Sequence, residues 1–382
     1  MAAAPAFPAR VAGEKAISAA RPKYLFFCPW PVHPGTGVNN VIVGLSEVLS
    51  SEFKPEIVVT GWQGPPSGTT WLKLPALELT PRKLPGYLAR FVPNAIRLIR
   101  LGRGAVAINA HFFGSELLPV ALLRKMKLLP KLVLSVHGAD VTEVARGSRC
   151  DRMLYRFICR QADAVIACSE SLAEQVRALS PEARTFPIPN GVSPAPAMFG
   201  PRPMRDPYLV SVAAFVKKKG HDVLLDAFQS LSVEFPELKL VLIGNDGTQR
   251  VSIEQQIKAA GLEDRVRMIV NLEHGRIWNW VHHAQCFVHS AREEPFGIAV
   301  LEAALAGTPV VSTAVGGIRE YLRNEVDGLT CEPDNPELFA AHVRRTLLDP
   351  ARARARAIRF RQKAGAFTWK ATWERYRAVC GL

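Results

Sequence analysis

The chain has 382 residues, a formal net charge of +14 and 48% hydrophobic residues. This length predicts two domains, and the apolar content excludes a broadly disordered chain. Its seven cysteines are scattered without a Cys-x-x-Cys pair, which argues against a disulfide framework or a zinc module and for a reducing compartment. Residues 1–20 lack the apolar core of a signal peptide and are expected to form a disordered tail. No apolar run approaches the roughly 18 residues of a membrane span, so we expect a cytoplasmic protein.

The positive charge is unevenly placed. Between Glu78 and Asp140 the only acidic residue is Glu116, whereas lysines and arginines are frequent and are interleaved with apolar residues. Such a segment suits an anionic membrane surface or an acidic partner, and an ordinary solvated helix face is an equally good interpretation. A second basic run, residues 351–363, has little apolar content and is expected to form a solvated helix.

Strand-like apolar runs alternate with helical patterns along the chain. In the first half the expected strands are "KYLFFCPW", "PEIVVTGW", "GAVAINAHF", "KLVLSVHG" and "ADAVIACS". After a proline-rich stretch the pattern restarts with "YLVSVAAF", "LKLVLIGN", "VRMIVNL", "CFVHSA", "TPVVST" and "GLTCEP". This alternation predicts two doubly wound, Rossmann-like α/β domains with parallel sheets. We place them at residues 21–193 and 208–365, with a linker at 194–207 and a C-terminal helix at 366–382 that packs back on the first domain.

Ligands of doubly wound sheets bind at the carboxyl ends of the strands, which selects a few loops. Gly35 and Gly37, between the first strand and its helix, would let the backbone approach a phosphate at a helix start; a plain turn explains them equally well. His137 and Asp140 follow one strand and His111 another. Two interpretations of this group are equally good: the histidines have a structural role, or the three residues form a polar site.

A lysine-rich turn follows the first strand of the second domain. Lys219 comes directly before Gly220 and a helix, where an ammonium group could meet a diphosphate. For Lys217 and Lys218 we favour the interpretation of surface lysines.

The stretch "AREEPFGIAVLE" places Glu294 before a turn and Glu302 on the helix that follows. The first N–H groups of this helix, at Gly297 and Ile298, would bind an anion. Carboxylates on either side would repel that anion and would instead accept hydrogen bonds from hydroxyl groups. A molecule that carries hydroxyl groups, then phosphates, then hydroxyl groups again is a nucleotide-sugar. Paired carboxylates also occur in glycoside hydrolysis, which has no use for an anion site between them.

With these loops in view, the chain from about Tyr24 to its end resembles the group-1 family of retaining glycosyltransferases (glycosyltransferase family 4). The resemblance is strongest over "REEPFGIAVLEAALAGTPVVSTAVGGIREYL", which holds the E-x7-E element of the family. Further matches are "SVHGAD", "ADAVIACSES", "IPNGV", "KGHDVLLDAF" and "LKLVLIGNDG". The resemblance implies the GT-B fold, in which two Rossmann-like domains face a central cleft and the C-terminal one binds the nucleotide-sugar.

The resemblance also implies roles for single residues. Glu302 would hold the ribose hydroxyls, Glu294 the transferred sugar near its 3-hydroxyl, and His137 would lie beside its 6-hydroxyl; His137, Lys219 and Glu294 would be the catalytic residues. The distal phosphate would be bound by the backbone of Phe296, Gly297 and Ile298, with Lys219 and the loop of Gly35 and Gly37. Asn271 and Leu272 would meet the base, and His111 and Asp140 would lie on the acceptor side. No metal or cofactor is implied.

Two positions depart from the family pattern. Ala213 and Ala214 stand where the family has Gly-Arg, so a cation for the diphosphate is missing. Thr36 separates the two glycines that are usually adjacent.

The predicted function is transfer of a hexose-type sugar, with retention of configuration, from a nucleotide-diphosphate sugar to a hydroxyl of a glycan or lipid-linked acceptor. The setting would be polysaccharide or glycolipid biosynthesis in the cytoplasm, peripheral on the inner face of the membrane. The alternatives are a sugar-nucleotide epimerase of the same fold and a non-enzymatic basic binder of membrane or nucleic acid. Nucleic acid is not an expected partner, because the chain lacks interleaved nucleic-acid-binding motifs.

Overall fold

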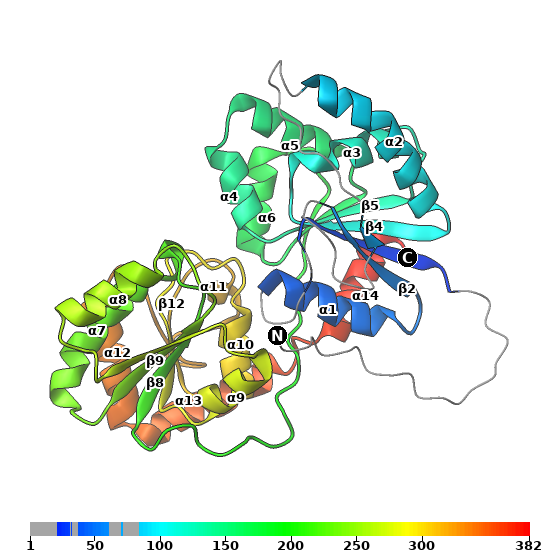
Figure 1. Ribbon diagram of the computed structural model, residues 1–382. Helices are drawn as coiled ribbons and strands as arrows, with labels where there is room; N and C mark the ends of the chain where they lie inside the picture. The colour runs from blue at the N-terminus through cyan, green and yellow to red at the C-terminus, as the bar shows by residue number, and fades with distance from the viewer. Residues whose placement is uncertain (1–20, 31, 33–36, 61–69, 72–83) are drawn as a thin grey trace, which may run out of the picture.

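The computed structural model describes residues 21–30, 32, 37–60, 70–71 and 84–382. Two parallel β-sheets, each flanked by helices, occupy separate lobes (Figure 1). The predicted architecture of two doubly wound α/β units is therefore confirmed. The domain limits at residues 193 and 208 stay a prediction.

The first sheet has the strand order β3-β2-β1-β4-β5-β6-β7, and all its strands are parallel. Its strands are β1 Lys23–Cys28, β2 Lys54–Val59, β3 Thr70–Trp71, β4 Ala105–His111, β5 Lys131–Val136, β6 Ala164–Ala167 and β7 Thr185–Pro187. The helices of this half are α1 Gly37–Leu49, α2 Leu84–Gly102, α3 Leu118–Lys125, α4 Ala139–Arg146, α5 Arg149–Gln161 and α6 Glu170–Leu179.

The second sheet has the order β10-β9-β8-β11-β12-β13 and is also parallel. Its strands are β8 Tyr208–Val212, β9 Lys239–Gly244, β10 Val266–Val270, β11 Cys286–His289, β12 Val310–Thr313 and β13 Leu329–Cys331. The helices are α7 His221–Glu234, α8 Arg250–Ala259, α9 His274–His282, α10 Ile298–Leu305, α11 Ile318–Tyr321, α12 Pro336–Leu348, α13 Pro350–Ala364 and α14 Trp369–Cys380.

The central strands are buried because helices cover both faces of each sheet. In β1 every residue from Tyr24 to Cys28 is at most 1% exposed, which explains why this strand reads as an uninterrupted apolar run. In each sheet the chain order reverses beside the first strand, between β1 and β4 and between β8 and β11. A crevice opens at the carboxyl ends of strands at such a switch point.

The C-terminal helix α14 returns to the first half of the chain and lies against α1 (Figure 1). The Trp373 ring meets Tyr24 edge-on at 5.4 Å between centroids. Beside it the two chain crossings between the lobes are joined, because the Val192 N–H donates to the Phe367 carbonyl oxygen at 2.9 Å. The Thr372 hydroxyl donates to the Pro189 carbonyl oxygen at 2.9 Å.

The basic helix α13 corrects one prediction. It was expected to be solvated, but one face is buried through Ala353, Ala357 and Phe360, and even Arg356 is only 5% exposed. The two alanines are four residues apart, so they lie on the same face of successive helical turns and make that face apolar. This face packs against α10, so α13 supports the helix that carries Glu302.

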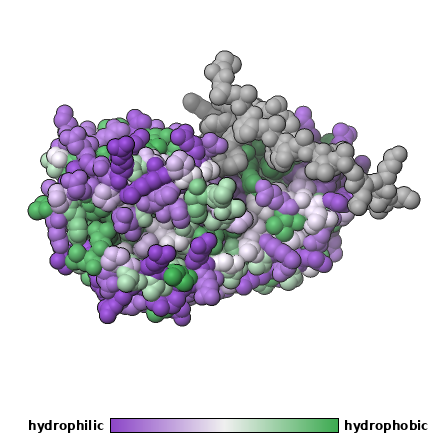
Figure 2. All heavy atoms as spheres, turned by 90° about the horizontal axis from the view of Figure 1, so that it is seen from below, coloured by the Kyte–Doolittle hydropathy of each residue, from purple (hydrophilic) through white to green (hydrophobic). Residues whose placement is uncertain are grey.

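The surface is largely hydrophilic on the face in Figure 2, where hydrophobic residues occur in small groups. The described side chains of α2 include exposed Val92 and Ile96 together with exposed Arg97 and Arg100. In the part of the chain that the structure describes, none of the helices combines the length and apolar character needed to cross a membrane.

Candidate active site

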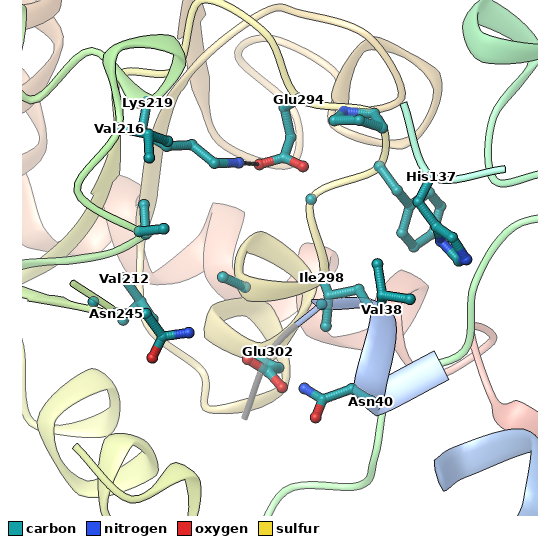
Figure 3. A pocket seen from close by; sticks show the side chains of 18 of the residues that line it. Val38, Asn40, His137, Val212, Val216, Lys219, Asn245, Glu294, Ile298 and Glu302 are labelled. Carbon is teal, nitrogen blue, oxygen red and sulfur yellow. Dashed lines mark hydrogen bonds and ion pairs between the residues drawn. The ribbon is translucent and has the colours of Figure 1, made fainter. Parts of the chain in front are cut away.

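A cavity of about 360 Å³ lies between the two lobes, at the carboxyl ends of the central strands (Figure 3). The predicted residues that line it are Gly37, His137, Lys219, Leu272, Glu294, Phe296, Gly297, Ile298 and Glu302. Ala214, where the family pattern has arginine, also lines it. The structure thus brings most of the predicted donor residues together in one space.

The start of α10 forms the middle of the cavity. Gly297 has φ of 92°, and a Cβ there would lie 2.5 Å from the Tyr321 hydroxyl oxygen, so a side chain does not fit. The Tyr321 hydroxyl donates to the Phe296 carbonyl oxygen at 2.8 Å and holds the turn. The N–H of Val300 already donates to the Gly297 carbonyl oxygen at 3.0 Å. The first N–H groups of a helix have no acceptor within it, so those of Gly297 and Ile298 can serve an anion in the cavity.

Glu294 marks one end of the cavity (Figure 3). Its Oε2 lies 2.5 Å from Lys219 Nζ and 3.2 Å from His289 Nε2, and its side chain is 12% exposed. Both partners converge on Oε2, which leaves Oε1 for a ligand hydroxyl. Burial would raise the pKa of Glu294, but the charge of Lys219 and the hydrogen bond from His289 outweigh it and hold the pKa well below its usual range. Glu294 is therefore a permanent acceptor rather than an acid.

His289 was not predicted from the sequence. It ends β11, is 2% exposed, and is the last residue of a strand that otherwise reads as core. Its place at a strand end, which singled out His111 and His137, was the one signal in the sequence that could have found it. Only the position of Glu294, which follows in the next loop, shows why a polar side chain is buried there.

Glu302 lies at the other end of the cavity from the Lys219–Glu294 pair (Figure 3). It is 9% exposed, and its Oε1 lies 2.9 Å from Nε2 of His274, the first residue of α9. The hydrogen bond to Glu302 raises the pKa of His274, although burial opposes this shift. His274 lines the cavity and was not predicted, because its partner lies on another helix.

The pair of His274 and Glu302 predicts a pH-dependent stability difference. A histidine whose folded-state pKa is raised stabilises the fold fully below the unfolded value of about 6.5, and this contribution is lost as the pH rises through the folded pKa. Relative to the wild type, His274→Gln is expected to unfold about 2 °C lower at pH 5.5, for a pair worth about 1 kcal/mol. The difference should vanish by pH 8.5.

Thermal melts of both proteins at constant ionic strength measure this difference. Burial lowers the pKa of His137 and of His221 to about 4, so these residues destabilise the fold as the pH falls below about 6.5. They do so equally in both proteins, so they cancel in the comparison. A difference that grows toward alkaline pH would contradict the assignment.

His137 faces the cavity from the first lobe, and His111 lies behind it. The His111 Nδ1 and His137 Nε2 atoms are 3.1 Å apart, which leaves Nδ1 of His137 for a substrate. Burial lowers the pKa of His137 to about 4 and that of His111 well below its usual value, so both rings are neutral at pH 7.

His111 and Asp140 do not line the cavity, and their expected acceptor-side position stays a prediction. His111 is 0% exposed, and its ring supports His137. The Asp140 carboxylate accepts hydrogen bonds from the N–H groups of Gly138 at 2.9 Å and of His137 and Phe113 at 3.1 Å each. It therefore fixes the loop that carries His137, which is a local structural task.

The predictions for Asn271, Lys218 and the loop of Gly35 have three different outcomes. Asn271 is exposed outside the cavity lining with φ of 55°, and its side chain accepts from the Asp246 N–H at 3.3 Å; only its neighbour Leu272 lines the cavity. Lys218, interpreted as a surface lysine, does line it, which corrects that interpretation. Gly35 and Thr36 lie outside the described residues.

A second cavity of about 370 Å³ adjoins the first. Lys218, Glu294 and Pro295 line both. Its wall carries hydroxyl and amide side chains from α4 and α6, among them Thr142 and Gln175. The two spaces therefore meet at the Glu294 end of the first cavity. Among the described residues, no group of three or more His, Cys, Asp or Glu side chains is arranged to hold a metal ion.

Comparisons with known proteins agree with this fold. The model described as "Glycosyltransferase Family 4" matches residues 35–195, and that described as "Glycosyl transferases group 1" matches residues 199–364. The fold is that of the Anabaena protein HepE in complex with UDP and glucose, with a TM-score of 0.77, 18% identity, and coverage of 94% of this chain and 100% of that one. The fold and the cavity define a two-lobed α/β protein of the GT-B type. The chain belongs to the group-1 glycosyltransferases, family 4.

Two curated relatives are similar over different extents. Glycogen synthase of Mycobacterium tuberculosis (strain H37Rv) is 32% identical over 219 residues, which are 56% of this chain and 53% of that protein. The match therefore spans about half the length of that relative. D-inositol 3-phosphate glycosyltransferase of Thermobispora bispora is 28% identical over 334 residues, which are 80% of this chain and 77% of that protein.

Proposed function

We propose that this protein transfers a hexose-type sugar from a nucleotide-diphosphate sugar to a hydroxyl of a glycan or lipid-linked acceptor, with retention of configuration and without a metal. The observation that carries the proposal is the order of groups along one cavity. Glu294 with its open Oε1 stands at one end, Gly297 and Ile298 at the start of α10 stand in the middle, and Glu302 stands at the other end. Sugar hydroxyls, diphosphate and ribose hydroxyls match these groups in turn.

The chemistry follows from the same groups. The diphosphate is the leaving group, and the helix start with Lys219 would stabilise its charge in place of a metal ion. Neutral His137 would contact the sugar through Nδ1. Retention would follow from attack on the face that the diphosphate leaves, with the departing phosphate taking the acceptor proton. Two lobes that close on the donor would exclude water, which otherwise hydrolyses it.

The second cavity favours transfer over epimerisation. It meets the donor cavity at the end where the sugar would lie, so it offers an acceptor room beside the reacting carbon. An epimerase needs no second substrate. Cytoplasmic placement at an anionic membrane surface, with α2 as the contact, is part of the proposal and rests on the exposed Val92, Ile96, Arg97 and Arg100. Sedimentation with vesicles that do or do not contain an anionic lipid would test that contact.

A thermal-shift screen against UDP-, GDP- and ADP-sugars tests the donor site. A donor at 100 times its Kd stabilises the folded protein by about 2.7 kcal/mol, so one nucleotide class should raise Tm by several degrees. Incubation of that donor alone and with an acceptor panel then separates the functions, because an epimerase converts the donor without acceptor. A chain stabilised by none of the nucleotides would overturn the proposal.

A further inference from the structure

Three consecutive lysines after β8 have three different surroundings. Lys217 is exposed and lines neither cavity, whereas Lys219 is paired with Glu294. Lys218, between them, is half-buried and lines both cavities. Lys218 thus lies at the junction where the first cavity and the second cavity meet.

The backbone fixes Lys218 at this junction. Its carbonyl oxygen accepts hydrogen bonds from the N–H groups of Arg292 at 2.8 Å and of Glu293 at 3.2 Å. The Arg292 guanidinium also donates to the Lys217 carbonyl oxygen at 3.0 Å and forms two hydrogen bonds with Asp222. The backbone of the lysine turn is therefore tied to the loop that carries Glu294, so Lys218 extends from a fixed main chain.

The positively charged side chains that line the two cavities differ in whether they have a carboxylate partner. Lys219 shares its charge with Glu294, His274 is paired with Glu302, and Arg292 is paired with Asp222 and Asp334. Of the lysines and arginines that line the two cavities in the described part of the chain, Lys218 alone has no carboxylate within ion-pair distance. A diphosphate at the start of α10 would add negative charge beside Glu294 and Glu302, and it needs an uncommitted cation nearby.

We propose that Lys218 binds the diphosphate of the nucleotide-sugar at the junction of the two cavities and stabilises it as the leaving group. This inference rests on the proposed function. In the step that it serves, the bond between the sugar carbon and the phosphate oxygen breaks and its electron pair stays on that oxygen. The acceptor oxygen forms the new bond to the carbon, and its proton passes to the departing phosphate. The Lys218 ammonium donates a hydrogen bond to the phosphate and keeps its own proton.

Calorimetric titration with UDP and with uridine tests the proposal, with GDP or ADP and the matching nucleoside if the donor screen selects them. Lys218→Met should weaken UDP binding about tenfold, because a charge-assisted hydrogen bond is lost. Uridine has no phosphate, so its affinity should change by less than about twofold. Lys218→Arg should restore most of the UDP affinity, since it keeps the charge and the donors.

Lys217→Met is the matched control. It removes the same charge from the neighbouring residue, whose side chain is exposed and lines neither cavity. It should leave UDP affinity within about twofold of the wild type. Equal losses in Lys217→Met and Lys218→Met would show a general effect of net charge and would overturn the role of Lys218. Unchanged UDP affinity in Lys218→Met would overturn it too. If the wild type itself binds none of the nucleoside diphosphates, the proposed function fails, and this inference fails with it.

Discussion

Replacing Glu294 with glutamine is expected to lower kcat for sugar transfer about 10²- to 10³-fold, the size of effect seen when one preorganised polar group is removed from an active site. Glutamine keeps the shape of the side chain and loses its charge. The hydrogen bond that Oε1 is proposed to accept from the sugar weakens, and Lys219 at 2.5 Å loses its counter-charge. The reacting sugar is then held less firmly, which costs rate more than binding.

The affinity of Glu294→Gln for UDP should rise or stay unchanged. With Glu294 neutral, Lys219 is released toward the diphosphate, so UDP affinity should not fall. A loss of kcat without a loss of UDP affinity separates Glu294 from a residue that only maintains the fold. Lys219→Met, by contrast, should reduce both kcat and UDP affinity, because it removes the cation itself.

Steady-state kinetics and titration with UDP provide the measurement, and Glu332→Gln provides the control. Glu332 is also an ion-paired glutamate of the second lobe, but its side chain is 72% exposed and its partner is Arg319. Its neutralisation should leave kcat unchanged within about twofold. If Glu294→Gln retains more than about a tenth of the wild-type kcat, the assignment of Glu294 to the transferred sugar is wrong.

The sequence was most informative where one chemical requirement repeats along the chain. Strands covered on both faces must be continuously apolar, so "KYLFFC" and "KLVLIG" were recognised as β1 and β9. The sequence could propose Glu294 and Glu302 for one site because they flank a glycine turn at a helix start, and both line the cavity. Glu294 and Glu302 are close in the sequence, so the turn and the helix between them fix their relative positions.

The residues that the sequence did not reveal depend on side-chain contacts between different elements of the fold. His289 and His274 have polar partners that belong to another loop or helix, so neither stands out from its neighbours. Lys218 and Lys217 are indistinguishable in the sequence, and only the structure separates them, because Lys218 lines both cavities and Lys217 lines neither. Asp140 shows the opposite case, because its carboxylate is used by adjacent N–H groups and is not left for a ligand.

The interface of α14 with the first lobe is the second place where a large effect is expected. Trp373 is 2% exposed, and its ring meets Tyr24 at 5.4 Å and Phe53 at 5.9 Å between centroids. Its indole N–H donates to Glu52 at 3.3 Å. Trp373→Ala removes this ring from the interface and should lower the free energy of unfolding of the first lobe by about 3–5 kcal/mol.

Urea unfolding followed by two spectroscopic probes measures this loss, and it also shows whether the lobes unfold together. The chain crossings at Val192 and Phe367 are hydrogen-bonded beside α14, so detaching this helix removes a tie between the lobes as well as a core side chain. Trp373→Phe, which keeps an aromatic ring, should recover much of the stability. Arg375→Ala on the exposed side of α14 should change it by less than about 0.5 kcal/mol. An equal loss in Arg375→Ala and Trp373→Ala would mean that helix α14 contributes through its charge, and the packed interface described for Trp373 would be wrong.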